Sequence, residues 1–136
     1  NGALTIFEGP FDSWLFPNSI ALSSIKNRPE NLLQLKNIRF LLDNDIAGKR
    51  KHRQYLNEGH LIFLWKKFIN DYNIKTPVKD WNDVINFCVK NKINPMNNID
   101  QYFSNKKIKK SYTHSLSTSS YQIYCSIKNC VEMHMA

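Results

Sequence analysis

The chain has 136 residues, of which 42% are hydrophobic and 22% charged, a composition typical of a soluble protein of one domain. No apolar run approaches the ~20 residues that a membrane-spanning helix needs, and three cysteines without a secretory signal favour the reducing cytoplasm over a disulfide framework. The net charge of +8 is uneven, because residues 1–48 carry four basic and five acidic side chains, whereas residues 49–136 carry fifteen and six. A basic half of this kind favours a polyanionic partner such as nucleic acid.

Four short and nearly continuous apolar runs predict strands that are buried on both faces. The runs are Ala3–Phe7, Ser19–Leu22, Ile38–Leu42 and Leu61–Trp65. Continuous apolar runs of this length are typical of a parallel sheet with helices on both sides, whereas a half-exposed sheet shows alternating residues.

Segments with helical features lie between and after these runs. Proline begins Pro10–Phe16 and Pro29–Leu35, as is common at the first position of a helix. The segment Ala47–Asn57 is polar and basic and ends before Gly59, and Asp80–Lys90 carries apolar residues at helical spacing. The alternation of strands and helices predicts an α/β fold with a doubly wound parallel sheet of about four strands.

The character of the chain changes after Ile108. The segment Ser111–Tyr121 is rich in Ser, Thr and Tyr and shows no clear period. We therefore expect one domain over residues 1–108 and a short C-terminal extension over residues 109–136, which is either loosely ordered or folded as a hairpin.

Acidic residues directly follow two of the predicted strands. Glu8 follows the first run, and Asp43 and Asp45 follow the third. Ligands of open α/β sheets bind beyond the carboxyl ends of the strands, and if the first and third strands are neighbours their ends lie ~4.8 Å apart. Three carboxylates in one crevice repel one another unless some are protonated or a cation neutralises them, and their oxygens suit Mg²⁺. The alternative is that these are ordinary loop acids that cap helices.

Basic residues begin the helix that is predicted after the second acidic turn, where Gly48 lets the chain enter the helix tightly. Side chains at this position can hold nucleotide phosphates or a template backbone beside the acids, although a solvated helix face is an equally good interpretation. The candidate phosphate ligands here and downstream are Lys49, Arg50, Lys51, Arg53 and Lys79.

Three stretches of the chain resemble the motifs of Toprim catalytic domains, in the same order. Glu8-Gly9-Pro10-Phe11-Asp12 resembles the first motif, a Glu after strand one with an Asp four residues on. Asp43-Asn44-Asp45-x-Ala47-Gly48 resembles the second, an Asp-x-Asp followed by Ala-Gly. Lys79-Asp80-Trp81-Asn82-Asp83 resembles the stretch that closes many Toprim primase domains. The resemblance covers roughly Ala3 to Asp83 and is greatest to primases of large bacteriophages.

This resemblance implies a Toprim-like (Rossmann-like) sheet and metal-dependent nucleotidyl transfer in DNA replication, namely the synthesis of RNA primers on single-stranded DNA. It implies that Glu8, Asp43 and Asp45 hold Mg²⁺ or Mn²⁺ and carry the catalysis, with Glu8 as a metal ligand or as a general base. Asp12 and, more loosely, Asp80 match further acids of the family.

The partners that the resemblance implies are a single-stranded DNA template, ribonucleoside triphosphates and a replicative helicase. We expect no membrane partner and a location in the cytoplasm, or in the host cytoplasm if the protein is viral. Because the chain does not begin with Met and family primases carry a zinc-binding region before this domain, we expect a fragment without that region, which can be inactive on its own.

Two other functions stay open. A Toprim nuclease would use the same metals to activate water, and such nucleases often carry extra His or acidic residues near the metals. The four His residues of this chain are not grouped around the motifs, which favours a primase. A non-catalytic Toprim module that only binds DNA or proteins has usually lost motif acids, and none is lost here.

Most Phe and Trp side chains, including Phe11 and Trp14, lie on predicted apolar faces. We expect them in the core rather than as platforms for stacking nucleobases. Trp81 is the exception, because it lies inside the third motif.

Overall fold

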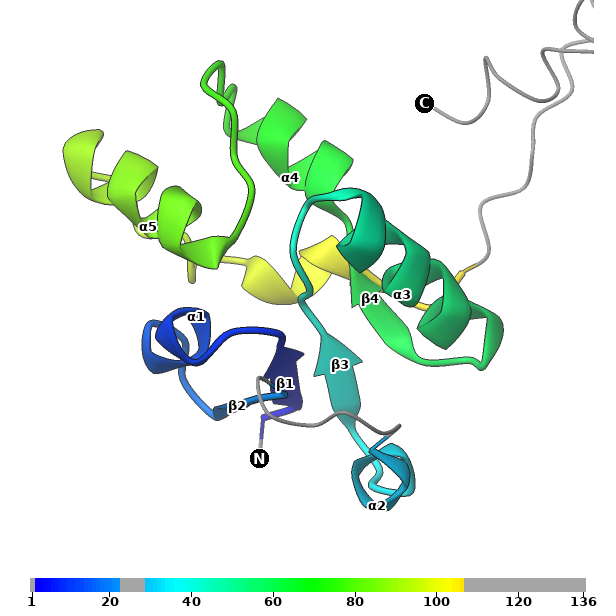
Figure 1. Ribbon diagram of the computed structural model, residues 1–136. Coiled ribbons are helices and arrows are strands. Elements are labelled where there is room, and N and C mark those ends of the chain that lie inside the picture. The colour runs from blue at the N-terminus through cyan, green and yellow to red at the C-terminus, as the bar shows by residue number, and fades with distance from the viewer. Residues whose placement is uncertain (1, 23–28, 107–136) are drawn as a thin grey trace, which may run out of the picture. The chain divides into compact units, whose positions relative to one another are not determined.

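A mixed five-stranded sheet forms the centre of the computed structural model, which describes residues 2–22 and 29–106. These residues belong to one unit, Asn1–Lys106 (Figure 1). The predicted extension over residues 109–136 lies outside the described residues. The strands are β1 (Leu4–Phe7), β2 (Ser19–Ala21), β3 (Ile38–Phe40), β4 (Leu61–Phe63) and β5 (Phe103–Ser104), in the order β2-β1-β3-β4-β5.

The α/β class and the four parallel strands confirm the prediction from the apolar runs. Strands β1 to β4 pair in parallel, with Ile6 opposite both Ile20 and Phe40. The two-residue strand β5 pairs antiparallel with β4 and was not predicted, because so short a segment carries no period.

The end of the fourth predicted strand was wrong. Strand β4 stops at Phe63, and Trp65 begins helix α4 (Trp65–Asp71). The backbone N–H of Leu64 donates to the carbonyl oxygen of Tyr102 at 2.7 Å, at the point where the chain leaves the strand. Trp65 and Phe68 are buried one turn apart on α4. This helical spacing is visible in the sequence, but it directly follows the apolar residues of β4, so the boundary between strand and helix was placed too late.

The other helices begin and end close to the predicted residues. They are α1 (Pro10–Trp14), α2 (Glu30–Leu33), α3 (Ile46–Asn57) and α5 (Trp81–Lys90). The 3₁₀ helix η1 (Ile99–Tyr102) was not predicted. Side chains of Asp45 and Asp80 cap the amino ends of α3 and α5, and Gly59, at φ +93°, turns the chain after α3. Among residues 2–22 and 29–106, no helix is long and apolar enough to cross a membrane.

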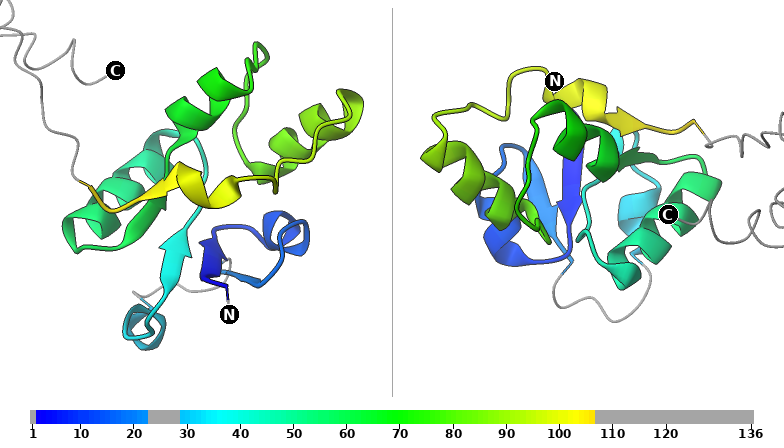
Figure 2. Two further views of the ribbon diagram at one scale, coloured as in Figure 1. Left: turned by 180° about the vertical axis from the view of Figure 1, so that it is seen from behind. Right: turned by 90° about the horizontal axis from the view of Figure 1, so that it is seen from above.

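Helices cover both faces of the sheet (Figure 2). Because side chains alternate along a strand, Phe7 and Phe63 belong to a core cluster with residues of α4, α5 and η1. Their neighbours Ile6 and Ile62 belong to a second cluster with residues of α3, against which side chains of α2 pack. Burial on both faces explains why the strand segments are continuously apolar.

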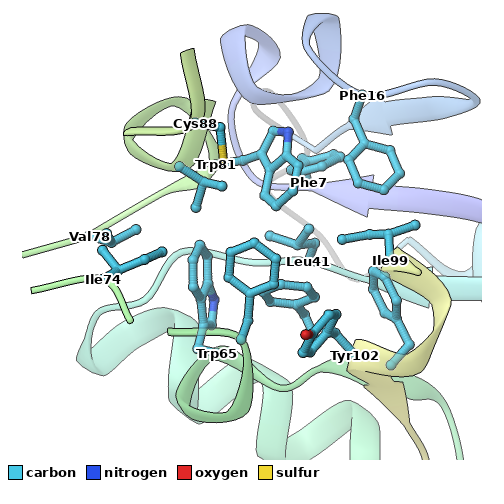
Figure 3. Packing of buried hydrophobic residues seen from close by; sticks show 14 residues of the cluster. Phe7, Phe16, Leu41, Trp65, Ile74, Val78, Trp81, Cys88, Ile99 and Tyr102 are labelled. Atoms are coloured by element: carbon cyan, nitrogen blue, oxygen red, sulfur yellow. The ribbon is translucent and has the colours of Figure 1, made fainter. Parts of the chain in front are cut away.

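Trp81 is the largest fully buried side chain of the first cluster (Figure 3). It is fully buried, and its ring centroid lies 5.3 Å from that of Phe16 and 5.9 Å from that of Phe68. Its indole N–H donates to the carbonyl oxygen of Leu15 at 3.3 Å. Trp81 therefore fixes the third motif to the core and is closed to a nucleobase.

Phe11 and Trp14, expected in the core, are instead exposed by 67% and 75%. The short helix α1 turns Asp12 inward, and its two aromatic rings lie on the outer side in an edge-to-face contact with centroids 5.2 Å apart. The prediction failed because a helix of five residues has one buried face, and here that face is used by a carboxylate.

Candidate functional site

Adjacent pairing of β1 and β3 brings Glu8 and Asp43 together at the carboxyl edge of the sheet. Glu8 directly follows β1, and its Oε2 accepts a hydrogen bond from the backbone N–H of Asp43 at 3.3 Å. Burial, and then the charge of Glu8, raise the pKa of Asp43 to about 7. The condition set by the sequence, that the first and third strands are neighbours, is met.

Asp45, the other acid of the second motif, caps helix α3. Its Oδ1 accepts from the backbone N–H of Gly48 at 2.7 Å. Its charge contributes, after those of Glu8 and Asp12, to the raised pKa of Asp43. Asp45 therefore does what the alternative interpretation expected, while staying within electrostatic reach of the paired acids.

Asp12 connects the first motif with the third. Asp12 is 7% exposed, and its Oδ1 accepts from the backbone N–H of Asn82 at 2.8 Å. Burial raises the pKa of Asp12; the hydrogen bond from Asn82 opposes this, and the charges of Asp80, Asp83 and Glu8 add to it. Asp80 itself caps α5 and accepts from the N–H of Asp83 at 2.9 Å.

The second motif also contacts the third. The backbone N–H of Asn44 donates to the carbonyl oxygen of Lys79 at 2.6 Å, and the Asn44 side-chain amide donates to the carbonyl oxygen of Val78 at 2.8 Å. The backbone N–H of Lys79 donates to the carboxylate of Asp83 at 2.8 Å. Each of the three motifs is thus hydrogen-bonded to the other two.

A close approach in the turn after β3 requires glycine at position 48. A Cβ on Gly48 would lie 1.9 Å from the carbonyl oxygen of Asp43 and 2.8 Å from its carbonyl carbon. The tight entry into α3 that the sequence predicted is therefore present, and it fixes the backbone of Asp43 against the helix.

The candidate phosphate ligands lie mainly on α3. Lys49, Arg50 and Arg53 are exposed, and the side chain of Lys79 is exposed beside α5. Lys51 differs from them, because its Nζ donates to Oε1 of Glu8 at 2.8 Å. That hydrogen bond is the largest cause of the raised pKa of Lys51.

His52 is the residue of this site that the sequence did not single out. It is 4% exposed, and its Nε2 accepts from the backbone N–H of Leu42 at 2.9 Å. Burial lowers its pKa to about 4, against smaller opposing effects of Glu8 and of the Phe40 backbone. Its spacing from the buried Tyr55 and Leu56 was the available signal, but the basic run around it predicted an exposed face.

In the part of the chain that the structure describes, no three His, Cys, Asp or Glu side chains meet as a ready metal site. Hydrogen bonds to other partners keep the acidic side chains from converging on one point. Asp45 faces the amino end of α3, Asp12 faces Asn82, and Lys51 contacts Glu8. Glu8 and Asp43 remain as the closely paired acids, and carboxylate oxygens are the donors that Mg²⁺ and Mn²⁺ prefer.

Comparison with models of known protein families gives no match, and a search of curated protein sequences finds no match either.

We predict that Gly48→Ala lowers the free energy of unfolding by ~3 kcal/mol or more, because the added methyl group overlaps the Asp43 carbonyl and the turn must move. The matched control is Gly9→Ala, whose Cβ would meet Asp12 Oδ2 at an ordinary 3.4 Å. Urea denaturation of both variants measures the difference. A Gly48→Ala variant as stable as Gly9→Ala would contradict the close approach.

The two shifted pKa values give opposite dependences of stability on pH. The folded-state pKa of His52, about 4, lies below its ordinary 6.5, so the unfolded chain binds the proton and acidification through this window costs up to about 3 kcal/mol. The folded-state pKa of Asp43, about 7, lies above its ordinary 3.8, so acidification through that window favours the folded state.

Single variants should separate these two effects, which partly cancel in the wild type. We expect Asp43→Asn to lose stability more steeply than the wild type as the pH falls from 7 to 4. His52→Gln, whose side-chain oxygen can still accept from Leu42, should lose less or gain. Urea denaturation across this range measures both slopes, and parallel slopes for the two variants would rule out the assignment.

Proposed function

We propose that this chain is a Toprim-type metal-binding core of a DNA primase, which transfers nucleotides in RNA primer synthesis on single-stranded DNA. The observation that carries the proposal is the set of hydrogen bonds among the three motifs. Asp43 contacts Glu8, Asn82 contacts Asp12, and Asn44 contacts Lys79. Stretches that are far apart in the sequence thus form one edge, as a shared site requires.

The residues at this edge fit a divalent cation. The carboxyl groups of Glu8 and Asp43 are within hydrogen-bonding range of each other. The Lys51 ammonium group already contacts Glu8 as a cation. Burial and the charge of Glu8 raise the pKa of Asp43, so the negative charge of Asp43 is not fully balanced by a nearby positive group. Glu8 and Asp43 would hold the metal directly, with Asp45 reaching it by turning from the α3 cap.

Mg²⁺ or Mn²⁺ bound there would lower the charge on the attacking 3′-oxygen and on the leaving pyrophosphate. Exposed Lys49 and Arg50 lie near the amino end of α3, which Asp45 caps, and they can bind phosphate oxygens of the triphosphate or of the template. As a general base, Glu8 would have to accept a proton on a carboxylate that already accepts from Lys51 at Oε1 and from the Asp43 N–H at Oε2.

A nuclease would use the same acids on water rather than on a 3′-hydroxyl. Within residues 2–22 and 29–106, the histidine nearest to the acids is His52, which is buried and whose Nε2 accepts from the backbone N–H of Leu42. It is therefore not free to act as the additional acid or base of a nuclease site, which favours nucleotidyl transfer.

We predict that millimolar Mn²⁺ raises the melting temperature of the wild-type chain, because a ligand that binds only the folded state stabilises it by mass action. At a hundredfold excess over Kd, the gain in the free energy of unfolding is about 2.7 kcal/mol. Glu8→Gln and Asp43→Asn should lose this gain. Asp43→Asn should also melt higher than the wild type without metal, since a buried charge beside Glu8 is removed.

Two further variants complete the melting experiment. Asp45→Asn keeps a good helix cap and should reduce the gain from Mn²⁺, whereas Glu58→Gln, at the other end of α3, should keep all of it. No gain in the wild type, or an undiminished gain in both Glu8→Gln and Asp43→Asn, would show that the metal site is wrong.

We also predict that the chain binds single-stranded DNA with an affinity that falls steeply as salt rises, because residues 49–136 carry fifteen basic and six acidic side chains. Replacing Lys49 and Arg50 by Ala should weaken binding and reduce the salt slope. The matched control replaces Lys75 and Lys90, which are exposed outside α3. Fluorescence anisotropy at several salt concentrations measures both, and equal loss in the two double variants would show that α3 has no special part.

A further inference from the structure

Both oxygens of the Glu8 carboxylate are engaged within the described fold. Oε1 accepts from Lys51 Nζ at 2.8 Å, and Oε2 accepts from the backbone N–H of Asp43 at 3.3 Å. The side chain of Glu8 is 19% exposed, so that few directions of approach are left to a second cation. A divalent ion that takes Oε1 as a ligand would lie beside the Lys51 ammonium group and be repelled by its charge.

Lys51 is the contact that can be removed. The Asp43 N–H belongs to the backbone of the turn that Gly48 fixes, whereas the Lys51 side chain is 54% exposed on a flexible stem. An ammonium group and a divalent ion also exclude each other by charge from the same oxygen. The arrangement thus has a fixed donor on one oxygen and a movable cation on the other.

We propose that Lys51 is an internal counter-ion that competes with the divalent metal for Glu8. It neutralises the acids while no metal is bound, weakens the binding of free metal, and leaves Glu8 when the metal enters. This inference rests on the proposed metal site and adds how its affinity is set. Lys51 lies on α3 beside Arg50. Once released from Glu8, its ammonium group can bind an anionic ligand together with the exposed side chains of Lys49 and Arg50.

The competition predicts that removal of the Lys51 charge tightens metal binding. In the full 136-residue chain, Lys51→Met should bind Mn²⁺ at least about fivefold more tightly than the wild type, which corresponds to a modest ion pair. Lys51→Arg keeps the charge and should bind Mn²⁺ about as the wild type does. Isothermal titration calorimetry with Mn²⁺ alone measures the dissociation constants without an assay of activity.

A charge-matched control separates competition at Glu8 from a general change of net charge. Lys36→Met removes an exposed positive charge two residues before β3, at the opposite edge of the sheet from Glu8. It should leave the Mn²⁺ dissociation constant within about twofold, since exposed charges this far apart are screened. Circular dichroism and a thermal melt without metal establish that each variant is folded, and Glu8→Gln defines the loss of the site.

The outcomes distinguish this inference from the proposed function. If Lys51→Met and the wild type bind Mn²⁺ equally, or if Lys51→Met binds more weakly, the counter-ion role is overturned while the metal site stands. Equal tightening in Lys51→Met and Lys36→Met overturns it as well, because only net charge then matters. If neither the wild type nor Lys51→Met binds Mn²⁺, the metal site is wrong and the inference fails with it.

Discussion

The approach of Glu8 and Asp43 is the interaction on which the rest of this edge depends. Two unit charges about 4 Å apart repel by ~1 kcal/mol in water and by ~4 kcal/mol at the effective dielectric of a protein surface. The parallel register of β1 and β3, with Ile6 opposite Phe40, imposes this approach because both strands end at the same edge. Burial, and then this repulsion, raise the pKa of Asp43, and the contact of Lys51 with Glu8 offsets part of the negative charge.

After Leu41, whose backbone N–H donates to Ile6 of β1, the turn that follows β3 is held by groups from several helices and loops. The backbone N–H of Leu42 donates to His52 of α3, and the carbonyl oxygen of Leu42 accepts from the indole of Trp65 of α4 at 2.8 Å. Two residues on, Asn44 is bonded to Lys79, before α5. Buried backbone groups that are satisfied in this way keep Asp43 in one position, as a preorganised site requires.

Asp45 shows how one carboxylate can serve the fold and a site. Its hydrogen bond to Gly48 stabilises the amino end of α3, where the positive end of the helix dipole favours an anion. A cation at Glu8 and Asp43 would attract the same carboxylate, so metal binding and helix capping draw on one group. The acidic edge therefore combines like charges, which raise its energy, with a helix end and Lys51, which lower it.

The sequence by itself determined the helices and strands and the positions of the acidic residues relative to them. Continuous apolar runs, helix-starting prolines and the acids after Phe7 and Leu42 predicted four parallel strands with an acidic carboxyl edge. These features are local, because the period of side chains along a strand or helix depends on neighbouring residues.

Only the tertiary structure decided which strands are neighbours and what each charged side chain contacts. Lys51 reaches Glu8 across 43 positions of the chain, and Asp12 accepts from Asn82 across 70. Burial of His52 within a basic run, and exposure of Phe11 and Trp14 on α1, were likewise opposite to their local composition. Such contacts follow from how helices pack on the two faces of the sheet, and no local period contains that information.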